Sequence, residues 1–159
     1  MEVTIYMKMV IEKLKKNNKT ISTMESCTGG GVANAITNIE GASDVIKFSA
    51  VTYSNEYKIK MGVSKDIIDK YSVYSFKTAN EMSYNIAKFA NSNYGVGITG
   101  KLNRVDKNNL FGDDNVVFIS IYDKDNNKYY ESKVEATKKS RKENKELVIN
   151  EIINMLLKI

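Results

Sequence analysis

The chain has 159 residues, a net charge of +5, one cysteine and no histidine, and its 42% hydrophobic and 27% charged fractions suit a single globular domain. Without histidine, a Ser-His-Asp triad, a Cys-His pair and histidine-based zinc sites are excluded, and one cysteine builds no thiolate metal site, so we expect no metal and no cofactor. Since no apolar run approaches the roughly 18 residues of a membrane span and the N-terminus lacks a secretory leader, we expect a cytoplasmic protein without a membrane partner.

The basic residues are spread along the chain and mixed with acidic ones, apart from one denser run, "KKSRKENK", at 138–145. A solvated helix start is the interpretation that we favour for this run, and binding of a small anion is the alternative. We therefore do not expect nucleic acid as a partner.

The first third of the chain alternates helical and extended patterns. The opening segment, through Lys16, places Met9, Val10 and Leu14 on one side at helical spacing, and residues 20–24 are typical of a buried strand. After three glycines a second helical face follows, formed by Val32, Ala35, Ile36 and Ile39. Residues 43–54 are rich in β-branched and aromatic side chains and predict a second strand.

Helices are predicted next, followed by three strands and a final helix. Asn55 is a candidate cap of a short helix, and another helix begins near Ser64. The clearest helix covers 75–91, with an apolar stripe of Ala79, Met82, Ile86 and Phe89. The predicted strands cover 94–99, 115–123 and 127–136, and the last helix presents Val148, Ile152 and Leu156 to the core.

Two connections separate these strands, and together with the alternation they indicate the fold class. The polar loop 100–115 is long for a compact domain, which is typical of a functional or mobile segment, and "KDNN" at 124–127 predicts a hairpin. Because helices and strands alternate before a hairpin, we expect a three-layer α/β/α fold with a mixed sheet, in one domain over residues 1–159.

The stretch "MESCTGGG", residues 24–31, lies at a strand–turn–helix junction. The first amides of a helix have no partner within it and form a natural anion or oxyanion site, which glycines allow a ligand to approach closely. The Ser26 hydroxyl would project over this helix start as a nucleophile. The alternative is that Ser26 and Thr28 only cap the helix while the glycines turn the chain.

A serine nucleophile needs a base, and without histidine the available substitute is a neutral lysine. In "TYSNEYK", residues 52–58, Lys58 falls in the first turn of the helix that Asn55 would cap, which is the unfavourable end for a structural lysine. Burial or the helix dipole would lower its pKa, and at a pKa of roughly 7.5 about a quarter of the lysine is neutral at pH 7.

These same residues carry a family resemblance. Residues 22–64 resemble the C-terminal domain of the CinA (competence/damage-inducible) family, whose pattern is close to A-E-S-C-T-G-G, then G-x-S, then V-x-Y-S-N-x-x-K. "VYSFKTANEMS" is similar to the family's V-S-x-x-x-A-x-x-M segment, and "GVGITG" to its next strand. The resemblance runs from about Ile21 to Gly100, half of the chain.

The resemblance implies an activity and assigns roles to residues. Such domains act as nicotinamide-nucleotide amidohydrolases, in which the motif serine is the nucleophile and the motif lysine its base. These residues are Ser26 and Lys58 here, and Tyr53 matches the tyrosine that would position the leaving group or relay a proton to it. The resemblance further implies a pyridine nucleotide as the small-molecule partner and a homo-oligomer.

The resemblance also implies a set of substrate-site residues. Backbone amides of the turn would stabilise the oxyanion, Glu25 would hold the turn or serve as a structural acid, and Arg141, with Lys145 by position, would contact the phosphate. The full set of residues carried over to the substrate site is Glu25, Cys27, Thr28, Gly29, Gly30, Ser49, Thr99, Gly100 and Arg141.

One segment departs from the family pattern. After T-G the family continues I-A-G-P with further glycines, whereas this chain has "TGKLNRVDKNNLFGDD" at 99–114. An altered or inactive family member that binds a nucleotide or partner through the same glycine-rich turn is therefore the alternative function.

Two further motifs compete with this interpretation. Cys27 is a rival nucleophile, but it has no histidine to form a thiolate pair, and a buried small apolar side chain describes it better. "GVGITGK", residues 95–101, fits a phosphate-binding loop, but Leu102 stands where the magnesium-binding Ser or Thr is required, so we do not expect a nucleoside triphosphatase.

Overall fold

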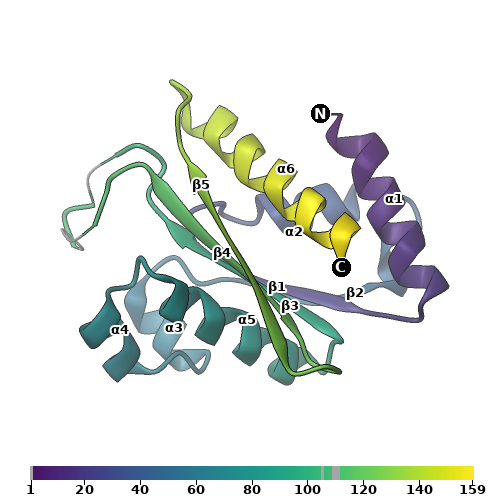
Figure 1. Ribbon diagram of the computed structural model, residues 1–159, viewed down its shortest axis with the longest axis horizontal. Coiled ribbons are helices and arrows are strands. Elements are labelled where there is room, and N and C mark those ends of the chain that lie inside the picture. The colour runs from purple at the N-terminus through teal and green to yellow at the C-terminus, as the bar shows by residue number, and fades with distance from the viewer. Residues whose placement is uncertain (1, 105, 109–111) are drawn as a thin grey trace.

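The computed structural model describes residues 2–104, 106–108 and 112–159. Within these ranges a five-stranded sheet lies between two layers of helices (Figure 1). The strands are β1 (Ile21–Glu25), β2 (Ile46–Val51), β3 (Tyr94–Gly100), β4 (Val116–Asp123) and β5 (Lys128–Glu135). The helices are α1 (Val3–Lys16), α2 (Gly31–Thr37), α3 (Asn55–Lys60), α4 (Lys65–Tyr71), α5 (Phe76–Ala90) and α6 (Arg141–Lys158), with a 3₁₀ turn at Ala42–Asp44.

The sheet is mixed, in the order β2-β1-β3-β4-β5. β1 is parallel to both β2 and β3, whereas β3, β4 and β5 pair antiparallel. Helices α1, α2 and α6 cover one face, and α3, α4 and α5 cover the other (Figure 1). The predicted three-layer α/β/α class with a mixed sheet is confirmed.

The chain leaves β1 and β2 in different directions, and this positions the cavity described below. β1 is followed by α2 on one face of the sheet, and β2 is followed by α3, α4 and α5 on the other face before β3 returns beside β1 (Figure 1). At such a point, where successive connections leave to opposite faces, a crevice opens at the carboxyl ends of the strands.

The core has two parts, one on each face of the sheet. The larger cluster lies beneath α1, α2 and α6 and includes Val10, Ile36, Ile119 and Ile152. The smaller cluster lies beneath α5 and consists of Met24, Val63, Ile68, Val73, Met82 and Ile86.

Helix α5 lies unusually close to the sheet because β3 carries glycine where the two meet. A Cβ atom at Gly95 would lie 2.1 Å from the carbonyl oxygen of Ser83, and one at Gly97 would lie 2.4 Å from that of Ala79. The strand backbone therefore contacts the helix backbone directly, which fixes the position of the end of β3.

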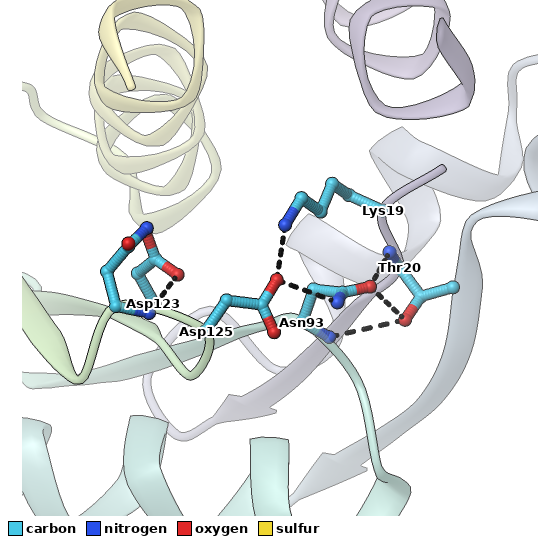
Figure 2. Close-up of polar contacts among 6 residues, drawn as sticks. Lys19, Thr20, Asn93, Asp123 and Asp125 are labelled. Carbon is cyan, nitrogen blue, oxygen red and sulfur yellow. Dashed lines mark hydrogen bonds and ion pairs between the residues drawn. The ribbon is translucent and has the colours of Figure 1, made fainter. Parts of the chain in front are cut away.

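Polar contacts join the elements at the amino ends of β1 and β3 (Figure 2). The Asn93 side chain accepts a hydrogen bond from the Thr20 amide at 2.8 Å and donates one to Asp125 at 3.0 Å. Lys19 forms an ion pair with the same Asp125 carboxylate. The start of β1, the start of β3 and the β4–β5 hairpin are thereby held in register at the end of the sheet away from the crevice.

Three local predictions are wrong. Met9 is 47% exposed, because Met7 and Ile11 share the buried stripe with Val10 and Leu14, and Met9 points about 100° away from Val10. Phe89 is 65% exposed, since the last turn of α5 reaches the edge strand, where the ring meets Phe48 at 5.2 Å between centroids.

The third wrong prediction concerns the cap of α3. Ser54, not Asn55, caps the helix: its hydroxyl accepts a hydrogen bond from the Tyr57 amide at 3.2 Å. Both residue types cap helices well, so the sequence alone did not separate these neighbours. Helix α4 begins after Ser64, as predicted.

Candidate active site

A cavity of about 640 Å³ opens at the carboxyl ends of β1 and β3. The segment after β1 contributes Ser26 and Cys27, and the end of β3 with the residue after it contributes Gly100 and Lys101. Helix α3 contributes Lys58, which lies in its last turn and not in the first turn as predicted. The position of the cavity matches the crevice that the topology creates, and its volume falls in the range of small-molecule sites.

A serine and a lysine meet on this wall. The Lys58 Nζ atom is hydrogen-bonded to Ser26 Oγ at 2.9 Å and donates to the carbonyl oxygen of Thr52 at 2.7 Å. Ser26 is 7% and Lys58 2% exposed. The Thr52 amide in turn donates to the Glu25 carbonyl at 2.8 Å, which joins the ends of the two strands from which the pair comes.

Burial makes Lys58 an unusually weak base for a lysine. The loss of water around Nζ lowers the pKa of Lys58 from its ordinary 10.5 to about 8, and electrostatic interactions with Cys27 and Asp106 oppose this change. About one in ten such amines is neutral at pH 7, compared with fewer than one in a thousand for an exposed lysine. A neutral amine next to a serine hydroxyl can accept its proton.

The Glu25 carboxylate organises the turn that carries Ser26. It accepts hydrogen bonds from the Thr28 hydroxyl at 2.6 Å, the Val32 amide at 3.0 Å and the Ala33 amide at 2.8 Å. Glu25 is fully buried and lies behind the turn rather than on the cavity wall. The carboxylate accepts hydrogen bonds from amides of the first turn of α2, where the helix dipole favours an anion.

Two glycines complete this turn with left-handed backbone, at φ +60° for Gly29 and +95° for Gly30. The amides of Gly29 and Gly31 donate to the carbonyl oxygens of Ser26 and Thr28, at 2.9 and 3.0 Å. The Gly29 amide is therefore occupied by the turn and is not a donor for an oxyanion, contrary to the expectation. The amides of Cys27, Thr28 and Gly30 take no part in these turn hydrogen bonds.

Two predicted residues meet at the cavity mouth. An Arg141 Nη atom donates to the Tyr53 hydroxyl at 3.2 Å, and both residues belong to the cavity wall. Lys145 lies one helical turn after Arg141, and its Nζ atom would be 3.4 Å from a Cβ atom at Gly29. Positive charge thus lies beside the glycine turn.

The structure places half of the predicted site residues on the described cavity wall and half outside it. Those on the wall are Ser26, Cys27, Tyr53, Lys58, Gly100 and Arg141. Those outside the described wall are Glu25, Thr28, Gly29, Gly30, Ser49 and Thr99. The Ser49 hydroxyl accepts a hydrogen bond from Thr23 at 2.7 Å, and the Thr99 hydroxyl donates to the Val73 carbonyl at 2.9 Å, so these two side chains bind within the protein.

The Cys27 thiol lies beside the pair but is chemically different from it. Cys27 is 5% exposed, and burial raises the pKa of its thiol to about 12. The thiol is therefore un-ionised at neutral pH and is a poor nucleophile.

Sequence reasoning missed a charged group on another part of the wall. The Tyr74 hydroxyl donates to the Asp106 carboxylate, and the Tyr74 ring centroid lies 5.0 Å from Lys101 Nζ. Lys101 is 3% exposed and forms an ion pair with Asp114 at 3.2 Å. The available signal was the long, charge-rich loop 100–115, which by its length alone indicated a functional segment.

Neither a metal centre nor a bilayer-spanning helix is found in the described ranges. Within them, Cys, Asp and Glu side chains do not gather in groups of three or more that could hold a metal ion. No helix there combines sufficient length with sufficient apolar character to cross a bilayer.

Comparison with known proteins gives consistent matches in sequence and fold. The sequence model of the family described as "CinA C-terminal domain" matches residues 4–159. A "CinA-like protein" of Kosmotoga olearia is 46% identical over 93 residues, which cover 58% of this chain and 23% of that protein. A "CinA-like protein" of Fervidobacterium nodosum is 45% identical over 93 residues, again covering 58% of this chain and 23% of that protein. The chain thus matches less than a quarter of the length of these relatives.

Solved structures show the same fold. The competence/damage inducible protein CihA from Agrobacterium tumefaciens superimposes with a TM-score of 0.88 at 24% identity, covering 99% of this chain and 94% of that chain. A competence-damaged protein (CinA) superfamily protein from Klebsiella pneumoniae superimposes with a TM-score of 0.90 at 18% identity, covering 98% of this chain and 96% of that chain.

Proposed function

Because this chain belongs to the CinA C-terminal domain family, we propose that it is an amidohydrolase that converts nicotinamide mononucleotide to nicotinate mononucleotide and ammonia. The observation that carries this proposal is the buried hydrogen bond of 2.9 Å between Lys58 Nζ and Ser26 Oγ. The family resemblance supplies the substrate, and the cavity of about 640 Å³ has room for a mononucleotide.

The reaction proceeds through an acyl-enzyme. Neutral Lys58 takes the Ser26 proton as Oγ attacks the carboxamide carbon, and the resulting ammonium passes this proton to the nitrogen, which leaves as ammonia. Lys58 then activates a water that hydrolyses the ester and releases the acid. Amides of the turn, from Cys27, Thr28 and Gly30, stabilise the oxyanion, and Arg141 binds the phosphate. We propose that these steps require no cofactor.

The lowered pKa of Lys58 predicts the pH dependence of the reaction. Only the neutral amine accepts the serine proton, so kcat/KM should rise with pH through about 8, where Lys58 titrates, and level off above it. A flat profile from pH 6 to 9, in an assay limited by chemistry, would contradict the assignment of the base.

The decisive experiment follows ammonia release from nicotinamide mononucleotide by the wild type, Ser26→Ala and Lys58→Ala. We expect both variants to lose at least about 10³-fold in kcat/KM, because nucleophile and base act as a unit. Ser43→Ala and Lys60→Ala are the matched controls, since both residues are exposed and Lys60 lies on the same helix as Lys58. Binding of the nucleotide without ammonia release by the wild type would favour the alternative, a catalytically altered member that binds through the same turn.

We further propose that the protein acts in the cytoplasm as a homo-oligomer, with a pyridine nucleotide as its partner and without nucleic acid. Support comes from the family resemblance and from basic residues that are mixed with acidic ones along the chain. Size-exclusion chromatography with light scattering tests the assembly, and a monomeric mass would contradict it.

A further inference from the structure

The segment after β3 brings a carboxylate into the cavity. Among the described residues that line it, Asp106 alone carries a carboxylate, whereas Lys58, Lys101, Arg104 and Arg141 carry basic groups. The Tyr74 hydroxyl donates to one Asp106 oxygen, and the Asn108 amide donates to the other at 3.0 Å. Asp106 is therefore held in place from two sides.

This carboxylate lies within electrostatic reach of the catalytic pair. The groups that act on Lys58 are the Ser26 hydroxyl and the Thr52 carbonyl, which are hydrogen-bonded to it, and Cys27 and Asp106, which interact with it electrostatically. The Asp106 charge raises the pKa of Lys58 and so partly opposes the effect of burial. Because Ser26 and Asp106 line the same cavity, a substrate whose carbonyl carbon lies at Ser26 Oγ shares that cavity with the Asp106 carboxylate.

The carboxamide of the substrate and the carboxylate of the product interact differently with Asp106, because they differ in hydrogen-bond donors and in charge. An amide nitrogen carries two N–H donors, which a carboxylate accepts in strong, charge-assisted hydrogen bonds. The acid product carries only acceptor oxygens and a negative charge, which another carboxylate repels.

Resting on the proposed function, we propose that Asp106, held by Tyr74, is the specificity-determining residue that accepts an N–H of the substrate carboxamide and repels the carboxylate of the product. No covalent bond forms to Asp106. The Ser26 proton moves through Lys58 to the leaving nitrogen, and the Asp106 charge stabilises that nitrogen as it gains the proton. Asp106 thus favours the amide on entry and expels the acid after hydrolysis.

The test compares Asp106→Asn with Asp113→Asn, a matched control in the same segment whose side chain is exposed and outside the described cavity wall. Asp106→Asn removes the charge but keeps the shape, and its amide nitrogen can donate to the acid product. We expect the KM for nicotinamide mononucleotide to rise about ten-fold and inhibition by nicotinate mononucleotide to strengthen about ten-fold. The acid limb of the pH profile should move to lower pH, because Lys58 loses a neighbour that raises its pKa. Asp113→Asn should change none of these.

A binding measurement separates this proposal from the proposed function. In a Ser26→Ala background, calorimetry with nicotinate mononucleotide reports affinity without turnover, and adding Asp106→Asn should strengthen binding about ten-fold. Unchanged affinity, in a protein whose wild type releases ammonia, overturns the role of Asp106 alone. If the wild type releases no ammonia, the proposed function fails, whereas stronger binding of the acid by the Asn variant still supports Asp106 as the residue that rejects carboxylates. Tyr74→Phe should shift the same quantities in the same direction by a smaller factor.

Discussion

One wall of the cavity comes from the segments that follow β1 and β2 and from α3, and another comes from residues 101, 102, 104, 106 and 108, which follow β3. On the first wall Ser26, Lys58 and the supporting Glu25 are buried, and backbone groups hold the lysine and the glutamate. On the second, Arg104 and Asp106 lie in a segment without regular structure in its described residues, and Asp106 is tied to Tyr74 by a side-chain hydrogen bond.

The two walls suit two different tasks in the function that we propose: the buried wall suits catalysis, and the wall without regular structure suits the selection of a substrate. The proton transfer that we propose between Ser26 and Lys58 needs a fixed short distance and a desolvated amine, which a buried wall supplies. Selection among substrates needs charges that differ from one relative to another, and an irregular segment can change these without disturbing the sheet. The departure of residues 99–114 from the family pattern therefore falls on the wall that tolerates change.

The largest expected contrast between the walls is in stability. Glu25→Ala leaves the Thr28 hydroxyl and the amides of Val32 and Ala33 buried without their acceptor, so the free energy of unfolding should fall by about 3 kcal/mol or more. Asp106→Asn on the other wall should change it by less than about 1 kcal/mol. Urea denaturation measures both, and similar losses would show that the two walls are equally structural.

The next largest effect is the pH dependence of stability that comes from Lys58. Burial of this lysine as a cation lowers the free energy of unfolding, because the unfolded chain binds the proton more tightly than the folded protein does. Its pKa is about 8 in the folded protein and 10.5 when exposed. Below pH 8 the full cost applies, and it disappears as pH rises from 8 to 10.5. Relative to Lys58→Met, the wild type should gain about 3 kcal/mol between pH 7 and pH 10.5.

Thermal or urea unfolding across this range measures the gain. Lys60→Met is the control, since that lysine is exposed on the same helix. A constant difference between Lys58→Met and the wild type across this range would mean that Lys58 titrates normally in the folded protein.

Arg141 tests whether the cavity mouth binds a phosphate. Arg141→Ala should raise the KM for nicotinamide mononucleotide about ten-fold and leave kcat nearly unchanged, because a phosphate contact is kept from ground state to transition state. Nicotinamide riboside, which lacks the phosphate, should be turned over equally by the variant and the wild type. The neighbouring Lys142→Ala is the control, and an equal effect on both substrates would contradict phosphate binding by Arg141.

Tyr53 should show the smallest effect and decides between its two predicted roles. It is 63% exposed and accepts a hydrogen bond from Arg141, which suits positioning better than proton relay. Tyr53→Phe should therefore lower kcat/KM about three-fold, the amount of one weak exposed hydrogen bond. A hundred-fold loss in kcat would instead assign the proton relay to Tyr53.

Much of the fold could be predicted because its elements carry strong local signals. The stripes of Val10 and Leu14, of Met82 and Ile86, and of Val148 and Ile152 identify three long helices, and the alternation with strands led to the fold class that is confirmed. The predictions that Met9 and Phe89 are buried were wrong. Helical spacing shows which residues share a face of a helix, but it does not show how much of that face the neighbouring layer covers.

The site residues could be predicted only where they lie close together in the sequence, or where the absence of a residue type excluded the other candidates. The absence of histidine left lysine as the base for Ser26, and the structure places Lys58 2.9 Å from it. The contact between Tyr74 and Asp106 joins residues 32 positions apart, with α5 and β3 between them, so no local pattern indicates it. The hydrogen bonds of Ser49 and Thr99 likewise depend on partners elsewhere in the chain.

The glycines of β3 have a consequence for the slowest motions of the molecule. With no Cβ atom between strand and helix, the backbones of β3 and α5 are in direct, close-packed contact at Gly95 and Gly97. Amide hydrogens of the middle of β3 and of the facing turns of α5 should therefore exchange with solvent deuterium only when the whole domain opens. The end of that strand, beside Ser26, is anchored to the least labile part of the chain, whereas amides of the described residues between 101 and 114 should exchange by local fluctuations.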